Sequence, residues 1–137
     1  MKVAIIGAGP AGISAALTLT SKNVHVTILD EQNTIGGQIY RNLETISEKK
    51  IQSLDIDHAN AKLLFKRVEE AVHQKLLTLI SGASVWSVTK NKEVSWSIEG
   101  KSYCQKFDAV ILATGAIERA MPLIGWTNPG VLTVGAA

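Results

Sequence analysis

Residues 3–17 read VAIIGAGPAGISAAL, and the character of the chain changes twice within them. The β-branched residues before the glycines favour a strand, whereas the alanines and leucine after them favour a helix. Pro10 suits the first turn of a helix, where its missing N–H has no partner to lose. The stretch therefore predicts a strand, a tight turn and a helix. Its glycines also interrupt the uncharged run 3–21, which argues against a signal peptide or a membrane span.

A second strand follows the helix and completes a βαβ unit. Residues 24–29, VHVTIL, are rich in β-branched side chains and end at the acidic pair Asp30 and Glu31. Parallel strands need a crossover such as this helix. We expect both strands to be central in a sheet.

The three glycines of the turn have the spacing of a dinucleotide-binding site. Gly7, Gly9 and Gly12 form G-x-G-x-x-G at the mouth of the predicted helix. The first permits the tight turn, the second admits a pyrophosphate close to the main chain, and the third lets the helix pack on the strand. The helix N-terminus offers N–H donors to the phosphates. An acid at residue 30 or 31 would accept hydrogen bonds from an adenosine ribose and disfavour a 2′-phosphate.

A simpler interpretation treats the glycines as turn residues and the two acids as a solvated strand end. The G-x-G-x-x-G pattern alone is a weak signal. Here the flanking strand, the helix and the acid stand in the order that a nucleotide site requires, and this order favours the dinucleotide interpretation.

The rest of the chain continues the alternation of helix and strand signals. Between residues 58 and 75, apolar residues recur every three or four positions opposite charged ones, which predicts an amphipathic helix. Residues 32–53 are expected to form a long loop. Short strands are expected at residues 76–80, 85–89, 94–98, 102–107 and 109–113.

The pattern of these short strands indicates the fold class. Val94, Trp96 and Ile98 alternate with serines, as in a strand with one buried face, so residues 84–107 are expected to form an antiparallel meander. The continuous apolar run 109–113 indicates a parallel strand buried on both faces. We expect an α/β fold: one Rossmann-like nucleotide-binding domain over residues 1–137, with a parallel sheet and an antiparallel β-meander crossover, incomplete at its C-terminus.

Composition narrows the range of functions. The 137 residues allow one domain, and the net charge of +2 is too small to indicate nucleic acid binding. The single cysteine excludes a disulfide framework and points to a reducing, cytoplasmic compartment. We interpret Cys104 as a packed thiol. The three histidines lack metal-ligand spacing, so no metal site is expected, and the three tryptophans, Trp86, Trp96 and Trp126, are expected to pack in the core and the meander.

Two further stretches of the sequence resemble a known family. Residues 30–41, DEQNTIGGQIYR, and residues 113–119, ATGAIER, resemble the FAD-binding domain of the two-dinucleotide-binding-domain flavoproteins. Gly125-Trp126, residues 129–131 and residues 135–137 add to this resemblance. It is strongest to the α-type subunits of heteromeric amine and amino-acid dehydrogenases, a group that includes opine oxidase, hydrogen cyanide synthase, hydroxyproline and proline dehydrogenases and sarcosine oxidase.

The resemblance implies FAD as the cofactor and assigns its contacts residue by residue. The residues implied are Gly7, Gly9, Pro10, Ala11 and Gly12 at the pyrophosphate, Asp30 or Glu31 at the ribose with Gln32 beside them, Gly36, Gly37, Gln38 and Arg41 toward the pyrophosphate and flavin, Val85 at the adenine, and Ala113, Thr114 and Gly115 in a second FAD fingerprint. The choice between Asp30 and Glu31 stays open at this point.

The resemblance also implies a function. The expected enzyme is a flavin-dependent oxidoreductase acting on a small amine or amino acid, with a partner subunit or a homo-oligomer. The substrate and the catalytic residues stay undetermined. A redox-active cysteine pair is absent, so disulfide reductase activity is not expected. Because the resemblance covers only the first segment of such a protein, we expect this chain alone to bind FAD weakly and to be inactive.

Two alternatives come from other functional classes. One is a catalytically inert module that associates through an unpaired strand edge near residues 109–113, with the nucleotide turn as a relic. The other is an NAD-only dehydrogenase, which Asp30 permits but which leaves the Gly36-Gly37-Gln38 and Ala113-Thr114-Gly115 matches unexplained.

Overall fold

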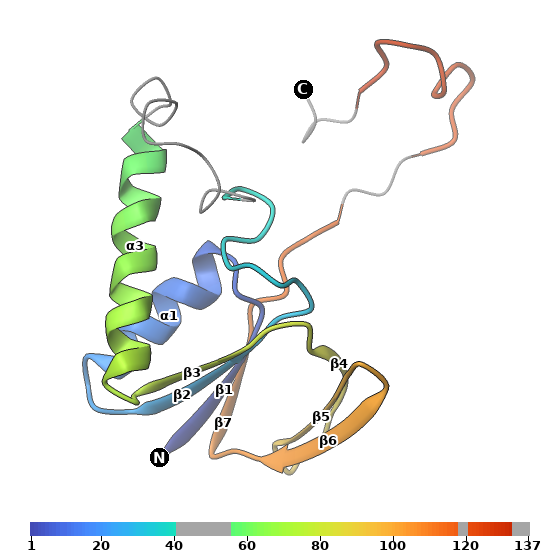
Figure 1. The fold of residues 1–137 in the computed structure, drawn as a ribbon. Coiled ribbons are helices and arrows are strands. Elements are labelled where there is room, and N and C mark those ends of the chain that lie inside the picture. Colours follow the sequence, from blue (N-terminus) through green and yellow to red (C-terminus); the bar gives the residue numbers. More distant parts are fainter. Residues whose placement is uncertain (41–55, 118–120, 133–137) are drawn as a thin grey trace.

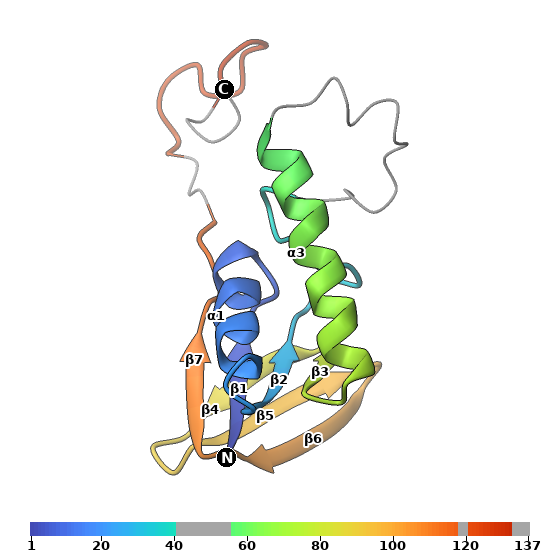
Figure 2. The same cartoon turned by 90° about the vertical axis from the view of Figure 1, so that its left-hand side faces the viewer.

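A computed structural model describes residues 1–40, 56–117 and 121–132 of the chain. A parallel sheet carries two helices on one face and a smaller antiparallel sheet on the other (Figures 1 and 2). The elements in chain order are β1 (Lys2–Ile6), α1 (Pro10–Thr20), β2 (His25–Leu29), α3 (Ile56–His73), β3 (Leu77–Ile80), β4 (Ser84–Val88), β5 (Glu93–Ile98), β6 (Lys101–Lys106) and β7 (Ala109–Leu112). The predicted α/β class, with its parallel sheet and its meander, is confirmed.

The four parallel strands have the order β3-β2-β1-β7, so the first two strands are central, as predicted. Neighbouring strands are in parallel register, with Val3 beside Val26 on one side and beside Ala109 on the other. Successive side chains of β1 point to opposite faces. Its residues Val3 to Ile6 therefore divide between two hydrophobic cores, which explains why the strand is apolar after Lys2.

The helical layer covers one face of the parallel sheet. Helix α1 buries Ile13, Ala16 and Leu17, and α3 adds Phe65 and Val68 to the same core. These positions repeat at helical spacing, so each helix presents one apolar stripe to the sheet. The short second turn of the chain, after α1, places β2 directly beside β1.

The meander covers the other face. Strands β4, β5 and β6 pair antiparallel in that order. Val94, Trp96 and Phe107 form a second core with Ala4 and Leu29 from the parallel sheet. The predicted alternation along β5 is thereby explained, because its apolar side chains face this core. The register shifts between Val85 and Ser87 in β4, next to the site described below.

Three predictions about burial are wrong. Strand β7 is not buried on both faces: it lies at the sheet edge, three of its residues are half-buried and Leu112 is 68% exposed. Cys104 is exposed because it lies on β6, an edge strand of the meander whose residues are all exposed. Of the tryptophans, Trp96 is buried and stacks on Tyr103 with ring centroids 5.8 Å apart, whereas Trp86 is 63% exposed and Trp126 is 48% exposed.

The chain after β7 leaves the two-sheet body. Residues 121–132 form turns without a helix or a strand, and Figure 1 shows this part of the chain extending away from the sheets. Several large apolar side chains are exposed along it, among them Leu123 and Ile124. Among the residues that the structure describes, no helix is both long and apolar enough to cross a membrane.

Candidate dinucleotide-binding site

The carboxyl ends of the parallel strands open onto one crevice of about 640 Å³. Chain leaving β1, β2 and β7 forms its walls, together with the start of β4. Open parallel sheets bind ligands at this end because the loops that leave neighbouring strands diverge there. The lining residues are Ile6, Gly7, Gly9, Pro10, Ala11, Leu29, Asp30, Glu31, Gln32, Gly37, Gln38, Ile39, Ala83, Ser84, Val85, Ala113, Thr114, Gly115, Ala116 and Ile117.

The turn after β1 contains three glycines with two different roles. Gly7 has φ +108, and a Cβ there would overlap the carbonyl oxygen of Ala113. A Cβ at Gly12 would overlap the carbonyl oxygen of Gly7. The fold itself therefore requires these two glycines.

Gly9 differs because the fold does not require it. Its φ of −74 is open to any residue, and among the described residues the nearest atom to a Cβ would be the Gly37 Cα at 3.9 Å. Gly9 lines the crevice as the N-cap of α1. A side chain at this position would occupy crevice space without distorting the turn. A ligand close to the main chain would explain why the residue is a glycine.

The N-terminus of α1 is chemically suited to an anion. Its N-cap residue makes no side-chain cap hydrogen bond, and no acid lies in its first turn. The first-turn N–H groups and the helix dipole can therefore act on a negatively charged group in the crevice.

A second glycine segment packs directly against this turn. The Gly36 N–H donates to the Ala8 carbonyl at 2.8 Å. A Cβ on Gly37, which has φ +61, would lie 2.9 Å from the Gly9 Cα. Two stretches that are distant in the sequence thus form one bare main-chain surface at the crevice.

Asp30 lies at the end of β2 and faces the turn. One carboxylate oxygen accepts a hydrogen bond from the Ala8 N–H at 2.5 Å, and the other accepts one from the Gln32 N–H at 2.7 Å. Glu31 is exposed, and its carboxylate lies 3.5 Å from the Gln32 side-chain amide. Both acids line the crevice, and no Lys, Arg or His is among the lining residues in the part of the chain that the structure describes. This end of the crevice therefore repels additional phosphate groups.

The opposite walls come from the meander and from β7. Val85 is half-buried on β4, next to Ala83 and Ser84. The wall that follows β7 is held to the end of β1 by a hydrogen bond, in which the Ala113 N–H donates to the Ile6 carbonyl at 2.8 Å. Gly115 follows with φ +70.

The structure thus brings together most of the residues that the sequence indicated. Of the predicted residues that it describes, all but Gly12 and Gly36 line the crevice, and those two support the turn from behind. Arg41 lies outside the described residues. The sequence prediction missed Ile6, Leu29, Ile39, Ala83, Ser84, Ala116 and Ile117. Most of these are neighbours of predicted residues at strand ends, which is the signal that could have found them.

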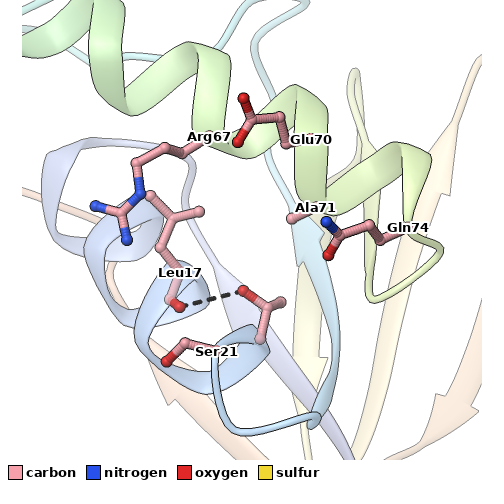
Figure 3. Close-up of a pocket in the computed structure, with 7 residues that line it drawn as sticks. Leu17, Ser21, Arg67, Glu70, Ala71 and Gln74 are labelled. Atoms are coloured by element: carbon pink, nitrogen blue, oxygen red, sulfur yellow. Dashed lines mark hydrogen bonds between the residues drawn. The ribbon is translucent and has the colours of Figure 1, made fainter.

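A second hollow, of about 130 Å³, lies between α1 and α3 (Figure 3). Leu17, Ser21, Arg67 and Gln74 line it, and the Thr20 hydroxyl inside it already donates to the Leu17 carbonyl at 3.2 Å. It is small and lies on the helical layer, away from the carboxyl ends of the strands. We therefore do not assign it to the nucleotide. No cluster of His, Cys, Asp and Glu suited to a metal ion occurs within the described ranges.

Comparison with known proteins also indicates a nucleotide-binding segment. Residues 1–135 match the sequence profile of the pyridine nucleotide-disulphide oxidoreductases. The chain belongs to this family. It is similar to an opine oxidase subunit of Agrobacterium tumefaciens, with 39% identity over 97% of the chain and 27% of that protein. It is also similar to the hydrogen cyanide synthase subunit HcnB of Pseudomonas protegens, with 29% identity over 96% of the chain and 28% of that protein.

Solved structures agree with the family assignment. The L-proline dehydrogenase of P. horikoshii superposes with a TM-score of 0.61 at 30% identity, over 88% of this chain and 23% of that one. A family oxidoreductase from Enterococcus faecalis has a TM-score of 0.60 at 23% identity, over 94% of this chain and 26% of that one, which supports the fold alone. The chain spans about a quarter of the length of the curated relatives it matches. It is the FAD/NAD-binding segment of a member of this oxidoreductase family.

Proposed function

We propose that the crevice binds FAD and that the chain is the FAD-binding part of an amine or amino-acid oxidoreductase. The observation that carries this proposal is the bare surface formed by Gly9 and Gly37 beside the N-terminus of α1. A pyrophosphate needs close main-chain approach and N–H donors, and this surface offers both.

The other walls suit the remaining parts of the cofactor. Asp30 keeps unused lone pairs on both carboxylate oxygens, because each accepts one main-chain N–H and an ionised carboxylate has about four acceptor positions. It can therefore accept hydrogen bonds from a ribose diol, and the exposed Glu31 adds negative charge that disfavours a 2′-phosphate. Val85 and Ala83 provide an apolar wall for the adenine. We therefore propose Asp30, and not Glu31, as the ribose acceptor.

FAD fits this site better than NAD alone for a specific reason. Gly37 and Gln38, and also Thr114 and Gly115, line the same crevice as the phosphate turn. An NAD-only site leaves both segments without a role. When bound, FAD supplies the redox chemistry by accepting a hydride equivalent from a substrate carbon, and the protein orients it.

The relatives support the substrate class and a partner subunit. Two of them are named as subunits of opine oxidase and hydrogen cyanide synthase, and a third is named L-proline dehydrogenase. We accordingly propose that the whole protein oxidises a small amine or amino acid and assembles with a partner subunit. No residue of the crevice is assigned as a general base.

Calorimetric titration of the chain with FAD, NAD, NADP and AMP tests the cofactor. We expect FAD to bind most tightly, NAD and AMP to bind more weakly, and NADP to bind weakest of the dinucleotides. Saturation at 100 times Kd should add about 2.7 kcal/mol to the free energy of unfolding. A preference for NAD over FAD would support the NAD-only alternative, and silence with every nucleotide would support the inert module.

A further inference from the structure

The Asp30 side chain makes contacts that a ribose acceptor does not need. Its carboxylate holds the N–H groups of Ala8, at 2.5 Å, and Gln32, at 2.7 Å. These two residues belong to different loops. Ala8 is in the phosphate turn after β1, and Gln32 begins the loop after β2.

The main chain of Asp30 is held as firmly as its side chain. Its N–H donates to the Ile80 carbonyl at 3.0 Å, and its carbonyl accepts from the Ala83 N–H at 2.8 Å. The residue is thereby tied to the end of β3 and to the entry into the meander. Its carboxylate consequently has a fixed position from which to hold the turn.

Ala8 depends on this carboxylate. The residue is completely buried, so its N–H has no access to water and must find a protein acceptor. Asp30 provides that acceptor. On the other side of the same residue, the Ala8 carbonyl accepts the Gly36 N–H at 2.8 Å.

These bonds form a continuous series from the acid to the bare main-chain surface. Asp30 holds Ala8, Ala8 holds Gly36, and the next residue, Gly37, packs on Gly9. A change at the carboxylate therefore reaches the phosphate subsite without any nucleotide being present. Glu31 is exposed, and within the described residues its carboxylate contacts the Gln32 side-chain amide and not the phosphate turn.

We propose that Asp30 is a positioning residue, whose carboxylate sets the shape of the phosphate turn and of the Gly36-Gly37 segment before any nucleotide binds. The consequence for cofactor affinity rests on the proposed function, but the effect on the turn does not. The acid is thus required twice, once for the empty site and once for the ribose.

Substitution Asp30→Asn separates this role from simple charge. The amide keeps the size of the side chain but replaces one acceptor oxygen with an NH₂ donor. Either Ala8 or Gln32 then faces a donor instead of an acceptor. Glu31→Gln is the matched control, because it removes one negative charge from the neighbouring residue and leaves the turn untouched. Asp108→Asn is a second control, because Asp108 also accepts a main-chain N–H, that of Lys2 at 2.6 Å, at the other end of β1.

The readout is amide hydrogen exchange of the nucleotide-free, ¹⁵N-labelled chain, followed by FAD titration. In Asp30→Asn we expect the Ala8 and Gly36 amides to exchange about tenfold faster than in the wild type, with FAD affinity reduced in parallel. Both controls should leave these two amides unchanged. Unchanged exchange of Ala8 and Gly36 in Asp30→Asn, with FAD affinity lost, would overturn the proposal, because Asp30 would then act only through the ribose.

Two features keep the test decisive. If Asp30→Asn does not fold, the wild type can be tested for scalar coupling between the Ala8 amide nitrogen and the Asp30 carboxyl carbon, which exists only if the hydrogen bond forms; its absence contradicts the proposal. If FAD binds neither to the wild type nor to any variant, the proposed cofactor is wrong. The exchange rates of the Ala8 and Gly36 amides still test the positioning role in that case.

Discussion

The two ends of the parallel sheet use the same interaction for different purposes. At the amino end, the Asp108 carboxylate accepts the Lys2 N–H at 2.6 Å, and at the carboxyl end the Asp30 carboxylate accepts the Ala8 N–H at 2.5 Å. Asp108 lies between the meander and β7 and joins this connection to the start of β1. Asp30 instead lines an open crevice among glycines.

The difference follows from topology and not from residue type. At the amino end, Asp108 leads directly into β7, and its own N–H donates back to the Lys2 carbonyl at 2.9 Å. At the carboxyl end, the chain leaving β1 enters α1, which crosses to β2, while the chain leaving β7 runs away on the other side. Diverging loops leave a space that a ligand can fill. An aspartate that only stabilises the fold at one end can therefore also serve a ligand at the other.

The largest expected effect is a loss of stability, and it tests whether close main-chain packing at the carboxyl end of the sheet is needed for the fold. Gly7→Ala combines strain at φ +108 with overlap on the Ala113 carbonyl oxygen. We expect the free energy of unfolding to fall by roughly 2–5 kcal/mol in urea denaturation. Gly100→Ala is the control, because Gly100 has φ +77 and no atom of the described part of the chain lies within 4 Å of a Cβ there. This variant should lose only about 1–2 kcal/mol of the free energy of unfolding. Equal losses would show that Ala113 does not restrict the turn.

The next effect is a loss of FAD affinity without a comparable loss of stability at the carboxyl end of the sheet. Gly9→Ala should lower FAD affinity by about tenfold or more, equivalent to about 1.4 kcal/mol, while the free energy of unfolding changes by less than about 1 kcal/mol. Gly9→Ser sharpens the test, because serine is a good N-cap and should preserve the stability of α1 while still obstructing the cofactor. Calorimetric titration and urea denaturation measure the two quantities. Undiminished FAD affinity in both variants would mean that the pyrophosphate binds elsewhere.

A smaller effect is expected at the amino end. Asp108→Asn keeps one acceptor oxygen, and the residue is exposed, so we expect a loss of about 0.5–1 kcal/mol in the free energy of unfolding and no change in FAD affinity. Thermal denaturation followed by FAD titration checks both parts. A matching loss of FAD affinity would show that the two ends are coupled through β1 and would remove the contrast between them.

The smallest effect on stability concerns the sheet edges. Leu112→Lys on the exposed end of β7 should change the free energy of unfolding by about 0.5 kcal/mol or less. If chains associate through this edge, the mass measured by light scattering should fall on substitution, since edge lysines oppose strand pairing. Thr78→Lys on β3, the opposite edge strand, is the control and should leave the mass unchanged. A wild-type chain that stays monomeric at high concentration would eliminate association through β7.

The prediction of the fold from sequence succeeded where the signals are local. The strand, turn and helix of residues 2–20 follow from preferences of neighbouring residues, and the structure confirms them. Along β5, Val94, Trp96 and Ile98 face the second core as predicted, but Ser95 between them is buried as well. Burial of β7 was predicted wrongly because an apolar run looks the same in a central strand and at an edge. Cys104 was misjudged for a similar reason, since nothing local marks β6 as the outer strand.

The candidate site likewise has features that the sequence predicts and features that only the tertiary structure decides. The glycine spacing and the acid at the end of β2 can be identified in the sequence alone, because main-chain sterics restrict a tight turn to glycine and the length of β2 places the acid at its end. Which glycine the fold requires and which only lines the crevice depends on contacts with Ala113 and Gly37. Likewise, Asp30 acquires its hold on the turn from a residue 22 positions away, Ala8. Such long-range contacts exist only once the strands lie side by side. A hydrogen bond depends on the distance and angle between its donor and acceptor, and the order of residues in the sequence does not specify these.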